Sequence, residues 1–264
     1  MGGRMRCGSG GLQVGALVSG KVHDGPLVGQ ALRQLLARTE ITETKALVAV
    51  SDAMATFRIL NLPATATDQD VTALVAKQLP LDPEKLATRW IDLAARDAHR
   101  TVYAVAWDRA MLNNLVDAVK AAGLEPVAAE LKSVCVARTT PQASCIVVDL
   151  AAEPVEIVLV DRWVPQLWHR VQTATPAGDD LAEALAIPIR SVLRFYRREN
   201  GQDLALAAPV LISGEQSLSA QFLDRLSGLV EHPVLFLPAI PRVPPDVRHA
   251  TYLTCLGLLM RRGA

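Results

Sequence analysis

Asp149 is the residue whose position in this sequence most directly suggests chemistry. It lies at the end of the apolar run IVVDL, and after a short turn the chain returns as a second apolar run, PVEIVLV. A carboxylate at such a turn can hold a metal-bound phosphate, because Mg²⁺ binds through one or two carboxylates together with phosphate oxygens. The first question is therefore whether Asp149 holds a nucleotide.

A second candidate is the segment GALVSGKV, residues 15–22, which matches the pattern G-x-x-x-x-G-K of phosphate-binding loops. Val22 stands where such a loop needs a Ser or Thr hydroxyl for magnesium. The segment continues into HDGP and not directly into a helix, so its amides are not expected to converge on a phosphate. We interpret it as a turn that ends a strand.

The remaining reactive side chains are scattered along the chain. The sequence contains no H-x-x-x-H, H-E-x-x-H, G-x-S-x-G or C-x-x-C pattern, so it predicts no metal site and no catalytic residue. The histidines and cysteines are His23, His99, His169, His232, His249, Cys7, Cys135, Cys145 and Cys255. The basic run RFYRREN (194–200) is expected to be a solvated helix face, and the four tryptophans are expected to pack within strands.

Composition excludes one class of partner and favours a location. The 27 Lys and Arg residues balance 27 Asp and Glu residues, so no basic surface for a phosphate backbone is expected and we predict no nucleic-acid partner. With 264 residues and 50% of them hydrophobic, the chain can build a sizeable core, and we favour two lobes over one large domain. No apolar run approaches the roughly 18 residues of a membrane span and no signal peptide is recognised, so we expect a cytoplasmic protein.

Alternating strands and helices must position these residues. Periodicity and capping residues predict helices at 26–39, Asp68–Leu79, Asp108–Ala122, Asp179–Arg198, Leu218–Leu229 and Pro245–Arg262. Strands are expected at Leu12–Val18, 45–51, 55–63, 88–96, 100–108, 124–131, 146–150, 154–160, 163–171, 209–215 and 233–237. This order indicates an α/β class built from two similar units.

Four stretches carry a resemblance that runs over nearly the whole chain. They are KVHDGPLVGQALRQLLARTEITETKALVAVS, FRILNLPATATDQDVTALVAKQLPLDPEKLATRWIDLAA, VYAVAWDRAMLNNLVDAVKAAGLEPVAAEL, and the pair IVVDLAAEPVEIVLVDRW and PVLISGEQSLSAQFLDRLSGLVEHPV. In order and spacing they resemble the PilM-like proteins of type IV pilus assembly, members of the actin and FtsA superfamily of two-lobed ATP-binding folds.

The resemblance implies a fold and a division of the chain. The fold is an actin-like, ribonuclease H-like α/β fold in two lobes. Residues 1–143 are expected to form the first lobe, with an inserted subdomain at about 52–130. Residues 144–264 are expected to form the second lobe, with a C-terminal helix that returns to the first lobe.

The resemblance also implies nucleotide-binding roles for three residues, Asp149, Ser213 and Gly214. The hairpin that follows Asp149 takes the place of the second phosphate-binding hairpin of the family, and Ser213 and Gly214 take the place of its adenosine-binding element.

The sequence departs from the family pattern at each nucleotide contact. Asp149 is followed by Leu150 and Ala151 where the family has Asp-x-Gly, and Glu153 with Pro154 would place a carboxylate where a phosphate should lie. Glu215 and Gln216 replace further glycines after Gly214. Only eleven residues precede Leu12, so the first phosphate hairpin is expected to be missing and the first-lobe sheet to end in an open edge that needs a partner or a second copy of the chain.

Two hypotheses from different classes follow, beside a third in which the likeness has no functional content. The first is a scaffold of a type IV pilus or type II secretion-like machine, without active ATPase and without a cofactor, at the inner face of the cytoplasmic membrane. A groove of its first lobe would bind the cytoplasmic tail of a membrane-anchored PilN-like partner. The second is an actin-like ATPase that cycles its lobes, with Asp149 steering Mg-ATP and Gly214 beneath the adenosine.

Overall fold

The computed structural model describes residues 5–18, 20–79, 82, 84–93, 99–151, 154–171, 180–214, 218–241, 243–244 and 247–261. The chain divides into two compact units, Met1–Leu131 and Lys132–Ala264. The sequence predicted the division at 143/144. The difference arises because the helix that follows Leu131 packs with elements of the second unit. The assignment of these units as lobes and of an inserted subdomain stays a prediction.

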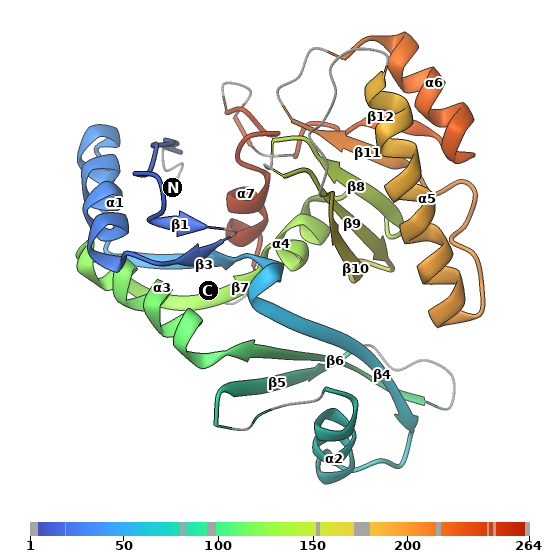
Figure 1. Cartoon of the computed structure of the whole chain (residues 1–264), viewed down its shortest axis with the longest axis horizontal. Helices are drawn as coiled ribbons and strands as arrows, with labels where there is room; N and C mark the ends of the chain where they lie inside the picture. Colours follow the sequence, from blue (N-terminus) through green and yellow to red (C-terminus); the bar gives the residue numbers. More distant parts are fainter. Residues whose placement is uncertain are drawn as a thin grey trace. The chain divides into compact units, whose positions relative to one another are not determined.

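The first unit begins with a small hairpin and two packed helices. Strands β1 (Leu17–Val18) and β2 (Lys21–Val22) pair antiparallel, and β3 (Lys45–Val50) pairs in parallel with β7 (Glu125–Leu131). Helices α1 (Gly25–Thr39) and α3 (Arg109–Ala121) lie side by side along these strands (Figure 1). They approach closely at Gly29, where an added Cβ would lie 2.8 Å from the Ala121 Cβ.

Farther along the chain, the first unit forms a three-stranded antiparallel sheet covered by one helix. The strand order is β4 (Ala55–Pro63), β6 (His99–Asp108), β5 (Leu86–Asp92). Helix α2 (Asp68–Gln78) begins with a capping box, because Thr67 and Asp70 each bond the other's backbone amide. Its buried Val71 and Val75 pack on Val102 and Ala104 of β6, which closes a small core.

The second unit is built on one five-stranded sheet with order β10-β9-β8-β11-β12. Its strands are β8 (Cys145–Asp149), β9 (Glu156–Asp161), β10 (Val164–Arg170), β11 (Val210–Ser213) and β12 (Val234–Phe236). Strands β8, β11 and β12 are parallel, and β9 and β10 are antiparallel to their neighbours. Helices α5 (Asp180–Asn200) and α6 (Ala220–Val230) cover one face, and α4 (Lys132–Thr139) and α7 (Leu253–Leu259) cover the other (Figure 1).

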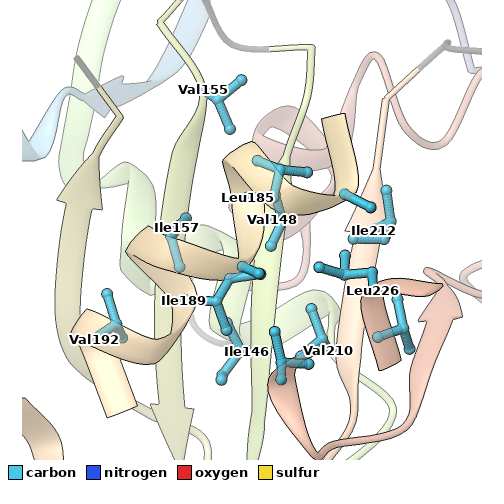
Figure 2. Packing of buried hydrophobic residues seen from close by; sticks show 14 of the residues in the cluster. Ile146, Val148, Val155, Ile157, Leu185, Ile189, Val192, Val210, Ile212 and Leu226 are labelled. Carbon is cyan, nitrogen blue, oxygen red and sulfur yellow. The ribbon is translucent and has the colours of Figure 1, made fainter. Parts of the chain in front are cut away.

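Alternation along β8 decides what each face of this sheet holds. Ile146 and Val148 point to α5 and α6 and join the main core together with Ile189 and Leu226 (Figure 2). Asp149 has the opposite parity and therefore lies on the face of α4 and α7. The continuous burial of β8 explains why its sequence is apolar apart from that last residue.

Most predicted elements are present, and three expectations were wrong. The strand expected at Leu12–Val18 is reduced to β1, because the chain turns at Gly15, where φ is +88°. The C-terminal helix is only α7, because His249 Nδ1 accepts a hydrogen bond from the Ile240 amide at 2.8 Å and holds that segment as a loop. Trp163 is 61% exposed in the β9–β10 turn with φ of +60°, and is therefore not a strand residue packed in a core.

Candidate functional site

A row of polar residues crosses the sheet of the second unit at the end of β8. Asp149 lies directly opposite Glu156 on one side and Ser213 on the other, and Glu156 lies opposite Arg170. Directly opposite residues project from the same face, so all four side chains share the face covered by α4. Asp149 and Glu156 are only 6% and 5% exposed. Two neighbouring buried carboxylates would repel each other, so this row requires cations.

Lys132, the first residue of α4, supplies one of the cations. Its Nζ lies 2.7 Å from Asp149 Oδ2 and 2.9 Å from Glu156 Oε2. Arg170 supplies the second, since its guanidinium donates to Glu156 Oε1 at 3.1 Å and lies over the ring of Trp168. Asp149 Oδ1 also accepts from the Ala151 amide at 3.1 Å. Two carboxylates and two cations therefore form a neutral cluster, which we call the Lys132 cluster: Lys132, Asp149, Glu156 and Arg170.

The ionisation of the Lys132 cluster reflects burial opposed by charge. Burial alone would lower the pKa of Lys132, but Asp149 and Glu156 raise it above its ordinary value. Burial alone would raise the pKa of Glu156, but the ammonium of Lys132 and the guanidinium of Arg170 lower it. Both shifts favour the charged forms of Lys132 and Glu156.

Ser213 and Gly214 continue this edge of the sheet beside Asp149. The Leu150 amide donates to the Ser213 carbonyl at 2.7 Å, and the Ser213 hydroxyl donates to the Ala250 carbonyl at 3.5 Å. Gly214 has φ of +139°, and a Cβ there would lie 2.8 Å from the Leu150 Cβ. The glycine is needed because the turn after β8 packs directly on it.

The structure thus brings together all three residues that the resemblance selected. Asp149, Ser213 and Gly214 meet at the carboxyl ends of two parallel strands, but their polar groups contact the chain itself. Glu153, Glu215 and Gln216, which the sequence placed around this site, lie outside the described residues. One buried donor of the cluster, Arg170 Nε, has no hydrogen-bond partner among the described residues. Ordered water is the usual partner of such groups.

The segment that resembles a phosphate-binding loop is part of a hairpin. Lys21 lies in β2 opposite Val18 of β1, and Gly20 packs against the side chain of Ser51. Helix α1 begins at Gly25 with Asp24 as its cap, so a carboxylate already accepts from the Leu27 amide in the first turn of that helix. This geometry agrees with the expectation of a turn next to a strand.

Sequence reasoning missed the two cations of the Lys132 cluster. Lys132 follows directly after a predicted strand, and no helix was expected at α4. Arg170 lies at the end of a predicted strand, and the meander of 146–171 held the necessary signal. A hairpin register that opposes Asp149 to Glu156 and Glu156 to Arg170 places one cation beside two carboxylates. The bridging Lys132 could not be found in this way, because it comes from a distant segment.

Neither a metal site nor a membrane-spanning helix is found within the part of the chain that the structure describes. No group of three or more His, Cys, Asp or Glu side chains there could hold a metal ion. In the same residues, no helix has both the length and the apolar character needed to cross a bilayer.

Comparison with known proteins identifies the fold. No protein-family model matches the chain, and no curated protein matches it by sequence. A chain of the solved PilM-PilN type IV pilus biogenesis complex superposes with a TM-score of 0.70 at 16% identity, over 93% of this chain and 88% of that chain.

Two further solved structures are more distant, with TM-scores below 0.5. The cytoplasmic domain of EpsL, an inner membrane component of the type II secretion system of Vibrio cholerae, gives a TM-score of 0.46 at 15% identity, over 76% of this chain and 79% of that chain. The ethanolamine utilization protein EutJ from Carboxydothermus hydrogenoformans gives 0.47 at 15% identity, over 92% and 76%. The likeness to a chain of the PilM-PilN complex confirms the predicted α/β fold as PilM-like.

Proposed function

We propose that this chain is a cytoplasmic scaffold of a type IV pilus or type II secretion-like machine, and that it binds the cytoplasmic tail of a membrane-anchored PilN-like partner. The observation that carries the proposal is the likeness to a chain of the PilM-PilN complex over 93% of the chain. In this proposal the chain lies at the inner face of the cytoplasmic membrane and is held there by its partner. A fold hosts many functions, so a second line of support comes from the site itself.

The Lys132 cluster supports a scaffold that works without nucleotide. Asp149 could ligate Mg²⁺ through Oδ2 only after losing Lys132, whose Nζ lies 2.7 Å from that oxygen, and its Oδ1 already accepts from the Ala151 amide. Breaking this buried pair leaves Lys132 with Glu156 as its one remaining carboxylate in the cluster, which costs about 3 kcal/mol or more. The binding energy of Mg-ATP would have to offset this cost before any net affinity appeared.

The first unit offers the features that a peptide tail needs. Strands β3 and β7 form a sheet of only two strands in the described residues, so each has an outer edge with backbone groups available for pairing. Large apolar side chains in this unit are exposed at Leu12, Val14, Leu17, Val18, Ile91 and Val127. We propose that the tail pairs with an open edge of this sheet and packs apolar anchors on exposed side chains of the unit, among them Leu17 and Val127. Such binding would depend little on nucleotide and only moderately on salt.

The test uses the N-terminal tail of a single-span membrane protein encoded beside this chain, as a labelled synthetic peptide in fluorescence anisotropy. We expect Leu17→Asp and Val127→Asp to weaken binding by about tenfold or more, because each places a charge among the anchors. The matched control is Leu235→Asp in the second unit, where Leu235 is 49% exposed, and it should leave the affinity unchanged. An unbound tail, or equal losses in all three variants, would overturn the proposal.

One observation favours the rival function, an ATP-binding ATPase. Ligands of open α/β sheets bind at the carboxyl ends of parallel strands, which is where Asp149, Ser213 and Gly214 meet. Titration calorimetry with Mg-ATP separates the two functions, and we expect no micromolar affinity. Micromolar binding, together with ATP hydrolysis that falls in Asp149→Ala, would establish the rival.

A further inference from the structure

A groove of about 560 Å³ lies along α5 and the end of α6 in the second unit, and no residue of the Lys132 cluster lines it. One wall is α5, and the other is formed by the segment after α5 and the end of α6. The apolar surface comes from Ile187, Leu193, Leu204, Leu206 and Leu229. Ile187 and Leu206 are 63% and 71% exposed, which is unusual for large aliphatic side chains.

Arginines form the charged rim of this groove. Arg190, Arg194 and Arg197 recur along α5 at spacings of four and three residues, so they lie on one face of the helix. Arg197 is paired with Asp203 at 3.6 Å, but Arg190 and Arg194 have no carboxylate partner among the described residues. Three arginines face two carboxylates, Asp203 and Glu231, so the rim carries excess positive charge.

The far wall of the groove is fixed by hydrogen bonds. The ring of His232 is buried and its Nδ1 lies 2.9 Å from the Ala208 carbonyl, which ties the segment after α5 to the end of α6. The Ser227 hydroxyl donates to the His232 carbonyl at 2.8 Å. A preformed wall lowers the conformational cost of binding a partner.

We propose that this groove binds an acidic amphipathic helix of a partner protein. Its length along α5 from Ile187 to Arg197 corresponds to about 15 Å at 1.5 Å per residue, enough for two to three turns of a helix. The apolar stripe of the partner would cover Ile187, Leu206 and Leu229, and its Asp or Glu residues would pair with Arg190 and Arg194. Two residues of the run RFYRREN, which the sequence suggested was a solvated basic face, therefore line the groove: Arg194 and Arg197.

The inference does not rest on the proposed function, because groove and tail surface lie in different units of the chain. Either can fail while the other stands. The tail peptide is tested with variants at Leu17 and Val127, and the groove with variants at Arg190 and Arg194.

The experiment selects peptides from a random 16-residue display library on the full chain and removes those that also bind Arg190→Glu/Arg194→Glu. We expect the retained peptides to share apolar residues at helical spacing and a net negative charge. The affinity of a synthetic selected peptide is then measured by anisotropy. It should fall about tenfold or more in Arg190→Glu/Arg194→Glu and in Leu206→Asp, and should rise when the salt concentration is lowered.

The matched control is Arg198→Glu, which reverses an exposed charge of the same helix outside the groove and should not change the affinity. Circular dichroism and thermal midpoints establish that each variant is folded. Selected peptides with basic character, or affinities equal across these variants, would overturn the inference. So would a dimer of the chain that dissociates in Arg190→Glu/Arg194→Glu, because the occupant would then be a second copy.

Discussion

The two faces of the five-stranded sheet in the second unit differ in whether their basic side chains have carboxylate partners. On the face of α4, Lys132 and Arg170 are largely buried and each contacts a carboxylate. On the side of α5, Arg190 and Arg194 are exposed and no described carboxylate contacts them. Charges that are matched internally hold a fold together, and charges left unmatched beside apolar surface are available to a partner. Residue type alone would not have separated these two roles.

The largest effect is expected for Lys132→Met, which removes the cation shared by Asp149 and Glu156. Two carboxylates that lie opposite each other on neighbouring strands would then be buried with only Arg170 to compensate. We expect the free energy of unfolding to fall by about 3 kcal/mol, measured by urea denaturation at pH 7.

The control for this prediction is the double variant Lys132→Met/Asp149→Asn, which removes one carboxylate together with Lys132 and leaves Glu156 paired with Arg170. It should recover much of the lost stability, because no uncompensated carboxylate remains. If Lys132→Met were as stable as the unaltered chain, the cluster would not be structural. Paired charges on one face would then not differ from unpaired charges on the other in their contribution to stability.

A smaller effect is expected from a pair of glycines on opposite sides of the same sheet. Gly257 of α7 packs on the backbone of Cys135 in α4, where a Cβ would not fit, whereas Gly228 of α6 has nothing within 4 Å of an added Cβ. Gly257→Ala should destabilise the chain by about 1–3 kcal/mol through overpacking. Gly228→Ala should stabilise it by about 0.5–1 kcal/mol, because alanine favours the helix. Thermal unfolding of both variants checks this, and equal signs would contradict it.

How much of this could be read from the sequence differs between fold and site. The order of strands and helices was predictable, because β8 is an uninterrupted apolar run and α2 and α3 begin at the side chains Thr67 and Asp108 that cap them. The Lys132 cluster was not predictable from the sequence. Its geometry depends on the register of β8, β9 and β10 and on the short helix α4, which no capping residue indicated in the sequence.

The C-terminal region shows the same limit at a smaller scale. Helical spacing predicted a helix from Pro245, but within the described residues 247–261 the helix begins at Leu253, and His249 accepts a hydrogen bond from the Ile240 amide instead. Trp163 was assigned to a strand by its neighbours, yet it lies in a two-residue turn with Arg162, both at positive φ. The contact between Ile240 and His249 could not be read from helical spacing. The position of Trp163 depends on the length of the turn between β9 and β10, which the pattern of neighbouring residues does not fix.

The pH dependence of stability offers a further test of the Lys132 cluster. The carboxyl of Glu156 has a lowered pKa, so its contribution is present above the ordinary value of 4.5 and is lost as the pH falls through the lowered value. The ammonium of Lys132 has a raised pKa, so its contribution is present below 10.5 and is lost as the pH rises through the raised value. We therefore expect a plateau between these limits in urea midpoints. Glu156→Gln should flatten the acid limb, and an unchanged acid limb would contradict the assignment.

The smallest effect on stability is expected for Arg190→Glu/Arg194→Glu, whose free energy of unfolding should change by no more than about 0.5 kcal/mol. Both side chains are exposed and neither loses a described carboxylate partner, so the folded state has little to lose. The matched comparison is Arg170→Met on the other face, which removes a buried cation that contacts Glu156 and should destabilise the chain several times more. Urea denaturation of the two variants at equal ionic strength makes the comparison direct.

Charges at the rim of a binding groove affect the affinity for the partner more than the stability of the fold. The same double variant should therefore keep a near-native free energy of unfolding and lose its affinity for the selected acidic peptide. A strongly destabilised double variant would instead make these arginines part of the fold, and the two faces would no longer differ in kind.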